Sequence, residues 1–501
     1  MHELLPDAKE LRVNQQLGRI SADDTDKLDQ LLLILPEGPK PGHFRQLPDG
    51  SRLAAAHKRS KAGKPVVTRL DNARQTLVVI GCLKPGAEAH ERLSFARKLT
   101  AAAIGDKPGQ LGIAAIGFTK TQQGIITLDA LAAALAAGFR LPSFKKKAPE
   151  APIRGLRLLG LRDKLDTGRI VAEARGNNLA RWLTALPPNK LDARNYAAIA
   201  RDLARRNGWQ YRRYSTAQLE KLGAGAFLAV AQGNSDNSAS IVRLRYRPKA
   251  RTARADVSLV GKGIIFDTGG TNLKPFQSML DMHGDMQGSA VALGTLLSIS
   301  SMKLPMAVDC WLAITENRTG PEAYKSQDVV TAANGKTIQT IHTDAEGRMA
   351  LADTLVLASR DKPSLIVDYA TLTGTCVSAV TTRYSGVFTN REEWHTRLQR
   401  IGIDSGERVW PFPIGEEFLE DLDSPVADLM QCSPNGAGDH ILAASFLKEF
   451  IEHDVAWLHM DLAASNHKGG LAHIPTEVTG FGVRYTMNLL LDAKLQETAR
   501  G

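Results

Sequence analysis

Short apolar runs alternate with amphipathic segments through the larger, C-terminal part of the chain. Several of these runs have the length and composition of buried strands. They are residues 240–246, 256–260, 305–313, 364–370 and 455–461. Apolar positions at helical spacing predict helices at 166–186 and 192–207, and similar patterns lie between several of the runs. This alternation predicts an α/β/α sandwich around a mixed, largely parallel sheet.

The same alternation appears on a smaller scale near the N-terminus. Apolar runs at 75–80 and 111–118 predict strands, and helical patterns follow them at 90–103 and 128–138. A chain of 501 residues is too long for one ordinary hydrophobic core. The sequence therefore predicts an α/β protein of two domains. The smaller N-terminal α/β domain covers residues 1–165, and the larger sandwich covers residues 166–501.

Charged residues follow the second apolar run of the larger domain. We expect this strand to stop at Gly261 and Gly263, so that Lys262 and Asp267 lie just past its carboxyl end. In open α/β sheets, ligands bind in the crevice beyond the carboxyl ends of the strands, which favours a chemical role for both side chains. The pair Gly269–Gly270 permits a sharp turn, because glycine reaches backbone angles that other residues avoid.

Further carboxylates stand at the starts of predicted helices. Asp285 precedes one apolar helical pattern, and Asp344 and Glu346 precede another. Each has an ordinary structural explanation, because Asp is a common helix N-cap and Glu is favoured in a first turn. Together with Asp267, however, they would crowd four anions into one crevice, which is unfavourable unless protons or cations neutralise them. Hard oxygen ligands suit Mg²⁺, Mn²⁺ or Zn²⁺, so we expect a pair of divalent ions.

Motifs around these residues resemble those of the cytosol (leucyl) aminopeptidase family, and they occur in the expected order. They are KGxxFDTGGxxLKP from Lys262, the Asp-Met pair at 285–286, NGKT at 334–337, TDAEGR at 343–348 and ATLTG at 370–374. The resemblance covers roughly residues 170 to 485, and TDAEGR is its most specific signature. It implies a metal-dependent aminopeptidase that releases unsubstituted N-terminal amino acids from peptides.

The resemblance also implies a role for each charged residue. One metal ion, Mn²⁺ or Zn²⁺, would be held by Lys262, Asp267, Asp285 and Glu346. The other would be held by Asp267, Asp344 and Glu346. Lys262 can bind a metal only as the neutral amine, which requires a lowered pKa. In the family, the residue matching Lys274 stabilises the oxyanion of the tetrahedral intermediate, and the residue matching Arg348 holds a bicarbonate that acts as general base.

By the same resemblance, the side chain of the first substrate residue enters a mostly apolar pocket. Its lining matches Met282, Thr371, Gly374 and Ala463. Such a pocket suits Leu and other apolar residues, although one methylene changes binding by only about 1 to 3 kcal/mol. His342 stands where the family usually has Asn, and it lies close enough to Asp344 to alter hydrogen bonding there.

Composition limits the setting in which the protein works. Hydrophobic residues make up 43% of the chain, and no apolar run approaches the length of a membrane span. The N-terminus lacks the basic and apolar regions of a secretory signal, so we expect a cytoplasmic protein. Its 4 cysteines are widely scattered and form no CxxC pair, which predicts reduced, mostly buried thiols rather than disulfides or a thiolate zinc site.

Net charge leaves a second type of partner open. The chain carries a formal charge of +10, and residues 1–170 hold 28 Lys and Arg against 17 Asp and Glu. A basic N-terminal region is more often a solvated surface than a nucleic-acid interface, but it keeps DNA binding as an alternative to the peptidase. A catalytically inactive scaffold is a further alternative. The family resemblance implies a homohexamer with peptide substrates and no membrane partner.

Overall fold

The computed structural model describes residues 3–6, 11–60, 64–105, 109–147, 150–248 and 254–499. Two compact units make up the chain. The N-terminal unit consists of Asp7–Ala174 and Lys468–Glu477, and the C-terminal unit of Met1–Pro6, Arg175–His467 and Val478–Gly501. None of the described helices is long and apolar enough to cross a membrane.

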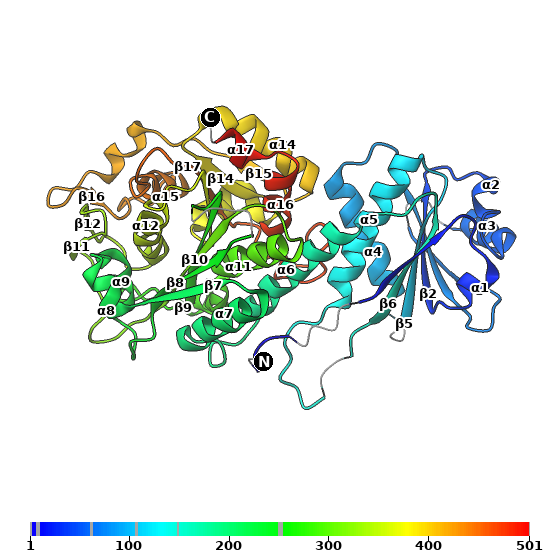
Figure 1. Cartoon of the computed structure of the whole chain (residues 1–501), viewed down its shortest axis with the longest axis horizontal. Helices are drawn as coiled ribbons and strands as arrows, with labels where there is room; N and C mark the ends of the chain where they lie inside the picture. The colour runs from blue at the N-terminus through cyan, green and yellow to red at the C-terminus, as the bar shows by residue number, and fades with distance from the viewer. Residues whose placement is uncertain are drawn as a thin grey trace. The chain divides into compact units, whose positions relative to one another are not determined.

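A six-stranded sheet forms the centre of the N-terminal unit (Figure 1). In spatial order its strands are β1 (Val13–Leu17), β6 (Ile153–Leu161), β5 (Gly109–Ala115), β2 (Gln30–Pro36), β4 (Leu77–Leu83) and β3 (Val66–Arg69). Neighbouring strands run parallel except β3, which is antiparallel to β4. The strands expected at 75–80 and 111–118 are confirmed as β4 and β5.

Helices cover both faces of this sheet. One face packs against α4 (Ala89–Ala103) and α5 (Lys120–Gly138), and the helices expected at 90–103 and 128–138 are thereby confirmed. The other face meets the short helices α2 (Pro41–Phe44) and α3 (Gly50–Lys58). The short helix α1 (Ala22–Thr25) lies in the sequence between Ile20 and Leu28, which belong to the same core. Successive residues of β2 enter different cores, because side chains alternate along a strand: Leu31 joins the second cluster and Leu32 the first.

An eight-stranded mixed sheet forms the centre of the C-terminal unit, which confirms the predicted α/β sandwich. Its strands are β15 (Val409–Pro411), β14 (Ser385–Thr389), β17 (Ala456–Asp461), β13 (Leu365–Ala370), β9 (Val257–Asp267), β10 (Val308–Asn317), β8 (Ser240–Tyr246) and β7 (Gln210–Ser215). The four strands from β17 to β10 run parallel, and β14, β8 and β7 introduce the antiparallel pairs.

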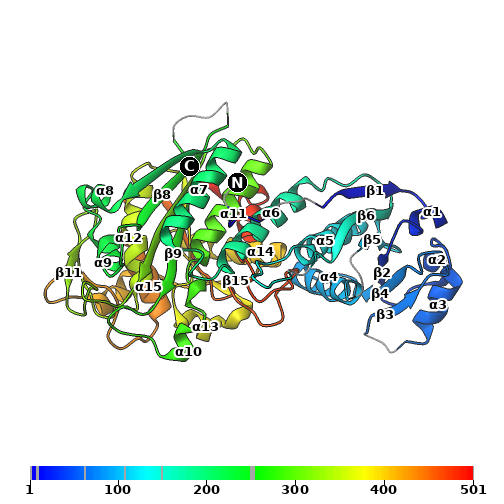
Figure 2. The same cartoon turned by 90° about the horizontal axis from the view of Figure 1, so that it is seen from below.

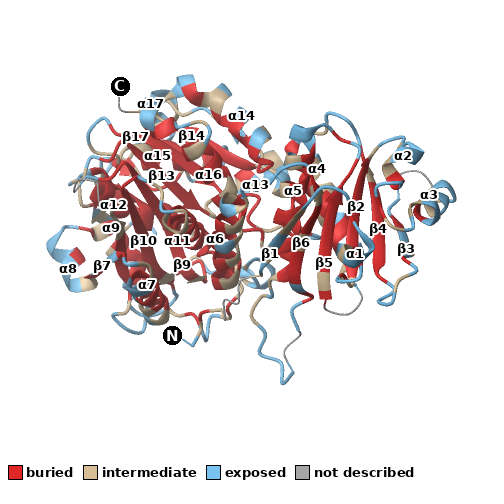
Figure 3. Ribbon diagram, turned by 45° about the vertical axis from the view of Figure 1, so that its right-hand side comes forward, coloured by how far each residue is buried: buried red, intermediate tan, exposed pale blue. Residues whose placement is uncertain are grey.

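Helices also cover both faces of this sheet (Figure 2). On one side lie α7 (Ala193–Asn207), α11 (Gln287–Ser301), α14 (His395–Ser405), α16 (Val483–Leu491) and the part of α6 (Gly168–Thr184) that begins at Arg175. On the other lie α9 (Gly225–Ala231), α12 (Glu346–Ser359) and α15 (Asp439–Lys448). Burial colouring shows the central strands with α11 and α12 as the interior of the unit (Figure 3).

Shorter elements complete the C-terminal unit. They are α8 (Thr216–Lys221), α10 (Phe276–Met279), α13 (Gly374–Val380), α17 (Leu495–Thr498), the small sheet β11 (Val329–Thr331), β12 (Thr337–Gln339) and β16 (Leu429–Met430), and the 3₁₀ turns η1 (Met282–Gly284), η2 (Thr381–Arg383), η3 (Glu392–Trp394), η4 (Glu416–Phe418) and η5 (Glu420–Leu422). The cysteines are free thiols, and all except Cys82 are buried.

The expectation that the strand after residue 256 stops at its glycines is wrong. β9 continues through Gly261, Lys262 and Gly263 and ends at Asp267. The glycines are there for packing: a Cβ on Gly261 would lie 2.3 Å from the Cα of Ser289, so the missing side chain lets α11 rest directly on the strand. Lys262 therefore projects from inside the sheet, whereas Asp267 stands at the strand end as expected.

Candidate functional site

One cavity of the C-terminal unit collects every catalytic, metal-binding and pocket residue that the sequence predicted. It has a volume of about 880 Å³ and lies beyond the carboxyl ends of β9 and β13. Its lining includes Lys262, Asp267, Lys274, Met282, Asp285, Asp344, Glu346, Arg348, Thr371, Gly374 and Ala463. Residues as far apart in the sequence as Lys262 and Ala463 therefore meet in one crevice.

The carboxylates converge closely enough to share metal ions. Oxygen atoms of Asp267, Asp344 and Glu346 all lie within 4.8 Å of one another. The Nζ atom of Lys262 lies 2.8 Å from Asp285 and 3.0 Å from Glu346, in a place where all three side chains are buried. A set of carboxylate oxygens joined by one amine nitrogen fits the ligand preferences of Mn²⁺ and Zn²⁺.

Helix capping does not explain these carboxylates. The N-cap residues of α11 and α12 are Met286 and Ala345, so neither Asp285 nor Asp344 caps the helix that follows it. Glu346 is the first residue of α12, where the helix dipole favours an acid, but its carboxylate also reaches Lys262. A role at a helix start therefore explains the position of Glu346 only in part, and it does not explain Asp285 or Asp344.

Burial and mutual repulsion raise the pKa values of three carboxyl groups in the cluster. Burial, with repulsion from neighbouring carboxylates, raises the pKa of Glu346 to about 8 and that of Asp344 to about 7. Burial also raises the pKa of Asp285 to about 6, although Lys262 acts in the opposite direction. The protein's own cations thus do not neutralise the site, which is the electrostatic condition that bound divalent ions relieve.

The two lysines form ion pairs with different carboxylates of the cluster. Burial lowers the pKa of Lys262, but Asp285, Glu346 and Asp267 outweigh it, and the net shift is upward. Lys274 lies 2.8 Å from Asp267 and 2.5 Å from Asp344, and its pKa is likewise raised because the carboxylates outweigh burial. Lys262 therefore keeps its proton next to free carboxylates, and only added cations would turn it into the neutral amine expected of a ligand.

Asn317 supports the cluster, although no motif in the sequence indicated it. A register shift between Thr315 and Asn317 in β10 brings Asn317 opposite Asp267 at the end of β9. Its amide donates to Asp267 Oδ1 at 2.8 Å and to the Thr343 carbonyl at 3.0 Å, and it lies 3.4 Å from Glu346. The backbone N–H of Gly269 donates to the same Asp267 oxygen at 2.8 Å, so this carboxylate is held from two directions.

Thr371 links the pocket to the metal cluster. Its hydroxyl donates to Asp285 Oδ1 at 2.7 Å, and its carbonyl accepts from Lys262 at 2.8 Å. Thr371 directly follows β13, as the strand pattern predicted. The remaining pocket residues come from η1 (Met282), the start of α13 (Gly374) and the segment after β17 (Ala463), and they bring mostly apolar surface beside the cluster.

His342 lies beside Asp344 without entering the cluster. Its side chain is exposed, and ring Nδ1 accepts a hydrogen bond from the backbone N–H of Asp344 at 3.2 Å. Burial of part of the ring and the nearby Lys274 lower its pKa. A neutral ring can accept that hydrogen bond, so His342 helps to fix the backbone at a proposed ligand.

Arg348 has a partner that the sequence did not suggest. The guanidinium is buried, with Nη1 donating to the Gln431 carbonyl at 3.1 Å and Nη2 donating to Asp439 at 2.7 Å. The expected bicarbonate therefore does not fit, because a carboxylate of the chain already neutralises this arginine. Asp439 lines the same cavity as the cluster.

Comparison with known proteins agrees with this geometry. A model of the catalytic domain of the cytosol aminopeptidase family matches residues 178–487. A probable cytosol aminopeptidase of Synechococcus sp. (strain CC9605) is 37% identical over 445 residues, covering 86% of this chain and 89% of the relative. One from Rhodopseudomonas palustris (strain BisA53) is 36% identical over 422 residues, covering 81% and 82%.

Solved structures extend the likeness to nearly the whole chain. The bottromycin maturation enzyme BotP in complex with Mn is 28% identical and superposes with a TM-score of 0.80, covering 93% of this chain and 99% of BotP. A mutant of tomato leucine aminopeptidase shares the fold with a TM-score of 0.83 at 24% identity, covering 97% and 98%.

Proposed function

We propose that this chain, which belongs to the cytosol aminopeptidase family, prefers peptides whose free first residue is Leu or another apolar amino acid. Membership of the family makes it a metal-dependent aminopeptidase, which is a hydrolase. The observation that carries the proposal is the convergence of Asp267, Asp344 and Glu346, with ligand atoms within 4.8 Å of one another, beside an apolar pocket. Peptide-bond hydrolysis needs an activated water and a polarised carbonyl, which such a site can supply.

We propose two divalent ions, Mn²⁺ or Zn²⁺, at this cluster. Lys262, Asp267, Asp285 and Glu346 would hold one, and Asp267, Asp344 and Glu346 the other. When bound, such ions supply Lewis-acid activation of water and of the substrate carbonyl. The complex of BotP with Mn supports manganese as one candidate.

The protein's own groups orient the substrate and stabilise charge. Carboxylates outweigh burial at Lys274 and raise its pKa, so this side chain remains an ammonium that can donate to the oxyanion formed when water adds to the carbonyl. Met282, Thr371, Gly374 and Ala463 would receive the first side chain of the peptide. A pocket of this kind favours apolar residues over charged ones, because a buried unpaired charge is costly.

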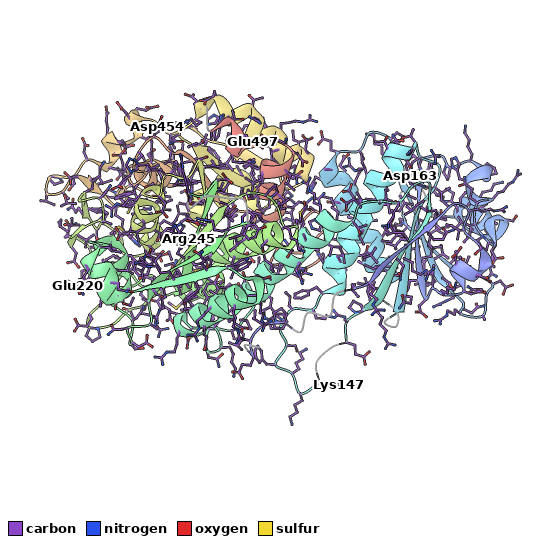
Figure 4. The ribbon with its side chains drawn as sticks, in the orientation of Figure 1. Lys147, Asp163, Glu220, Arg245, Asp454 and Glu497 are labelled. Atoms are coloured by element: carbon purple, nitrogen blue, oxygen red, sulfur yellow. The ribbon has the colours of Figure 1, made fainter. Side chains whose placement is uncertain are left out.

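Hydrolysis of leucine p-nitroanilide tests the proposal. Metal-stripped protein should be inactive and should recover when Mn²⁺ or Zn²⁺ is added, and the N-acetylated substrate should remain uncleaved. Glu346→Gln should fail to recover, whereas Glu220→Gln, a change at an exposed glutamate of α8 that Figure 4 labels, should recover like the unchanged protein. Absence of recovery with either ion in a folded protein would remove the proposed function.

Assembly and setting are further parts of the proposal. The family resemblance supports a homohexamer in the cytoplasm, and sedimentation velocity would measure the assembly. The sequence division at residues 165 and 166 remains a proposal for the functional domains, as does DNA binding by the basic N-terminal region. Mobility shifts over a salt series would test the latter, because phosphate contacts weaken steeply as salt rises.

A further inference from the structure

Arg348 is a buried cation, and groups of the chain accept hydrogen bonds from some but not all of its guanidinium nitrogens. The residue is 2% exposed, and its Nη2 donates to Asp439 while its Nη1 donates to a main-chain carbonyl. Among the described residues, its Nε has no hydrogen-bond partner. The Nε and Nη2 atoms of an arginine can donate two parallel hydrogen bonds to one carboxylate. In Arg348 this pair of donors, called its anion seat below, is half used: Nη2 donates to Asp439 and Nε donates to no described residue.

Asp439 holds this seat from the start of α15. It is the first residue of the helix, after Gly438 in a left-handed conformation with φ of 63°, and a helix N-terminus favours a negative charge there. Its side chain is 23% exposed, in contrast to the nearly enclosed arginine, and both line the cavity that holds the carboxylate cluster. The carboxylate is thus paired to Arg348 and remains accessible from the substrate side.

Other titratable groups surround Asp439. His342, His440 and Cys432 all feel its charge. None of them is a second cation, because burial lowers the pKa of both histidines and raises that of the thiol. Arg348 is therefore the permanent cation in the ion pair with Asp439, and an external anion approaching Arg348 would meet a carboxylate instead of a bare guanidinium.

We propose that Asp439 is the general base of this aminopeptidase, a carboxylate of the chain that occupies the seat of Arg348 and makes an external bicarbonate unnecessary. The inference rests on the proposed function. As water attacks, its O–H bond breaks and the proton passes to Asp439, while the oxygen forms a bond to the scissile carbonyl carbon. The same proton then passes to the leaving nitrogen as the C–N bond breaks, which restores the carboxylate.

A purely structural ion pair is the competing explanation, and substitution of Asp439 separates the two. Asp439→Ala removes the partner of Nη2 and so leaves both Nε and Nη2 of Arg348 without a carboxylate, whereas Asp439→Asn keeps a side chain there that cannot accept the proton. A matched control is Asp454→Ala, which removes an ion pair of the same type, Arg391 with Asp454, from a surface position where the carboxylate is 89% exposed (Figure 4).

The assay is hydrolysis of leucine p-nitroanilide by manganese-loaded protein in carbonate-free buffer, with bicarbonate or formate then added. We expect the unchanged protein and Asp454→Ala to be fully active without either anion. Asp439→Ala should lose about 10²-fold or more in kcat, the usual contribution of a positioned base, and regain activity with either anion. Asp439→Asn should lose as much and regain nothing.

A binding measurement gives a readout that does not depend on turnover. Bicarbonate should raise the melting temperature of Asp439→Ala and leave that of the unchanged protein where it was, because only an empty seat binds the anion. The proposal is overturned if the unchanged protein requires bicarbonate, if Asp439→Ala keeps full activity in carbonate-free buffer, or if no anion restores it. An unchanged protein inactive under every condition would instead remove the proposed function, and the melting comparison would still decide whether Asp439 fills the seat.

Discussion

Replacement of Asn317 by alanine tests whether the metal cluster depends on hydrogen bonds as well as on its ligands. The side chain of Asn317 is fully buried and donates to Asp267 at 2.8 Å, with Glu346 at a marginal 3.4 Å. A hydrogen bond to a charged group contributes about 1.5 to 3 kcal/mol. If only the shorter contact counts, Asn317→Ala should make the binding free energy of Mn²⁺ less favourable by about 2 kcal/mol, because Asp267 is no longer held in place. This corresponds to about a 30-fold loss in Mn²⁺ affinity.

Calorimetric titration of Mn²⁺ into metal-free protein measures this loss. Asn317→Asp keeps the shape of the side chain but replaces the amide donor with an anion between Asp267 and Glu346. The free energy of unfolding of the Mn²⁺-free protein should therefore fall further than in the alanine variant, and the Mn²⁺ titration curves of the two variants should differ. Asn207→Ala, at the end of α7 where the amide donates to the Leu203 carbonyl, serves as the control. Unchanged Mn²⁺ affinity in Asn317→Ala, with a normal unfolding midpoint, would refute the reasoning.

Further predictions concern packing, pH and metal removal. Gly288→Ala places a Cβ 2.0 Å from the Tyr369 carbonyl oxygen and should lower the free energy of unfolding by about 3 kcal/mol or more, whereas Gly105→Ala meets nothing within 4 Å; equal urea midpoints for both would contradict this. Burial lowers the pKa of His459, but Asp368 at 2.6 Å outweighs it, so the net pKa lies above the ordinary 6.5. The ion pair therefore stabilises the fold fully below pH 6.5 and less as pH rises through the folded pKa. Asp368→Asn should flatten this loss in urea unfolding measured from pH 6.5 upward; an unchanged slope would count against the pair. Removal of metal should lower the melting temperature, and Mn²⁺ at about a hundred times its dissociation constant should restore about 2.7 kcal/mol of stability; a melting temperature indifferent to Mn²⁺ would contradict a buried site.

The sequence predicts those elements whose apolar pattern is local. β8 begins and ends at the expected residues, and α7 differs by one residue at its start, because a periodic apolar face or a continuous apolar run specifies each. The predicted end of β9 is wrong, and the reason lies in the tertiary packing. Gly261 and Gly263 are ordinary strand breakers in sequence, but here close packing requires them inside the strand: α11 approaches Gly261, and the Ala313 carbonyl of β10 approaches Gly263.

The same distinction applies to the site. Side chains in a contiguous motif, such as Asp344 and Glu346, could be identified from the sequence and lie in one cavity with the others. Asn317 and Asp439 could not, because their contacts with the site are to residues far away in the sequence: Asn317 donates to Asp267, 50 positions away, and Asp439 accepts from Arg348, 91 positions away. Such partners are specified by the register of β9 against β10 and by the docking of α15, which no local pattern encodes.

The placement of Asp439 also decides how charge is distributed in the cavity. If Arg348 were unpaired, its charge would help to balance the carboxylate cluster, since Glu346 lies near enough to act on it. Because Asp439 neutralises Arg348, the cations paired with the carboxylates of the cluster, among the residues that the structure describes, are Lys262 and Lys274. The carboxylate cluster then keeps an excess of negative charge, which divalent ions can neutralise. Asp439, the proposed base, stays beside the cluster without being a metal ligand. Removing Asp439 should therefore reduce turnover far more than Mn²⁺ binding, whereas removing Asn317 should weaken Mn²⁺ binding first.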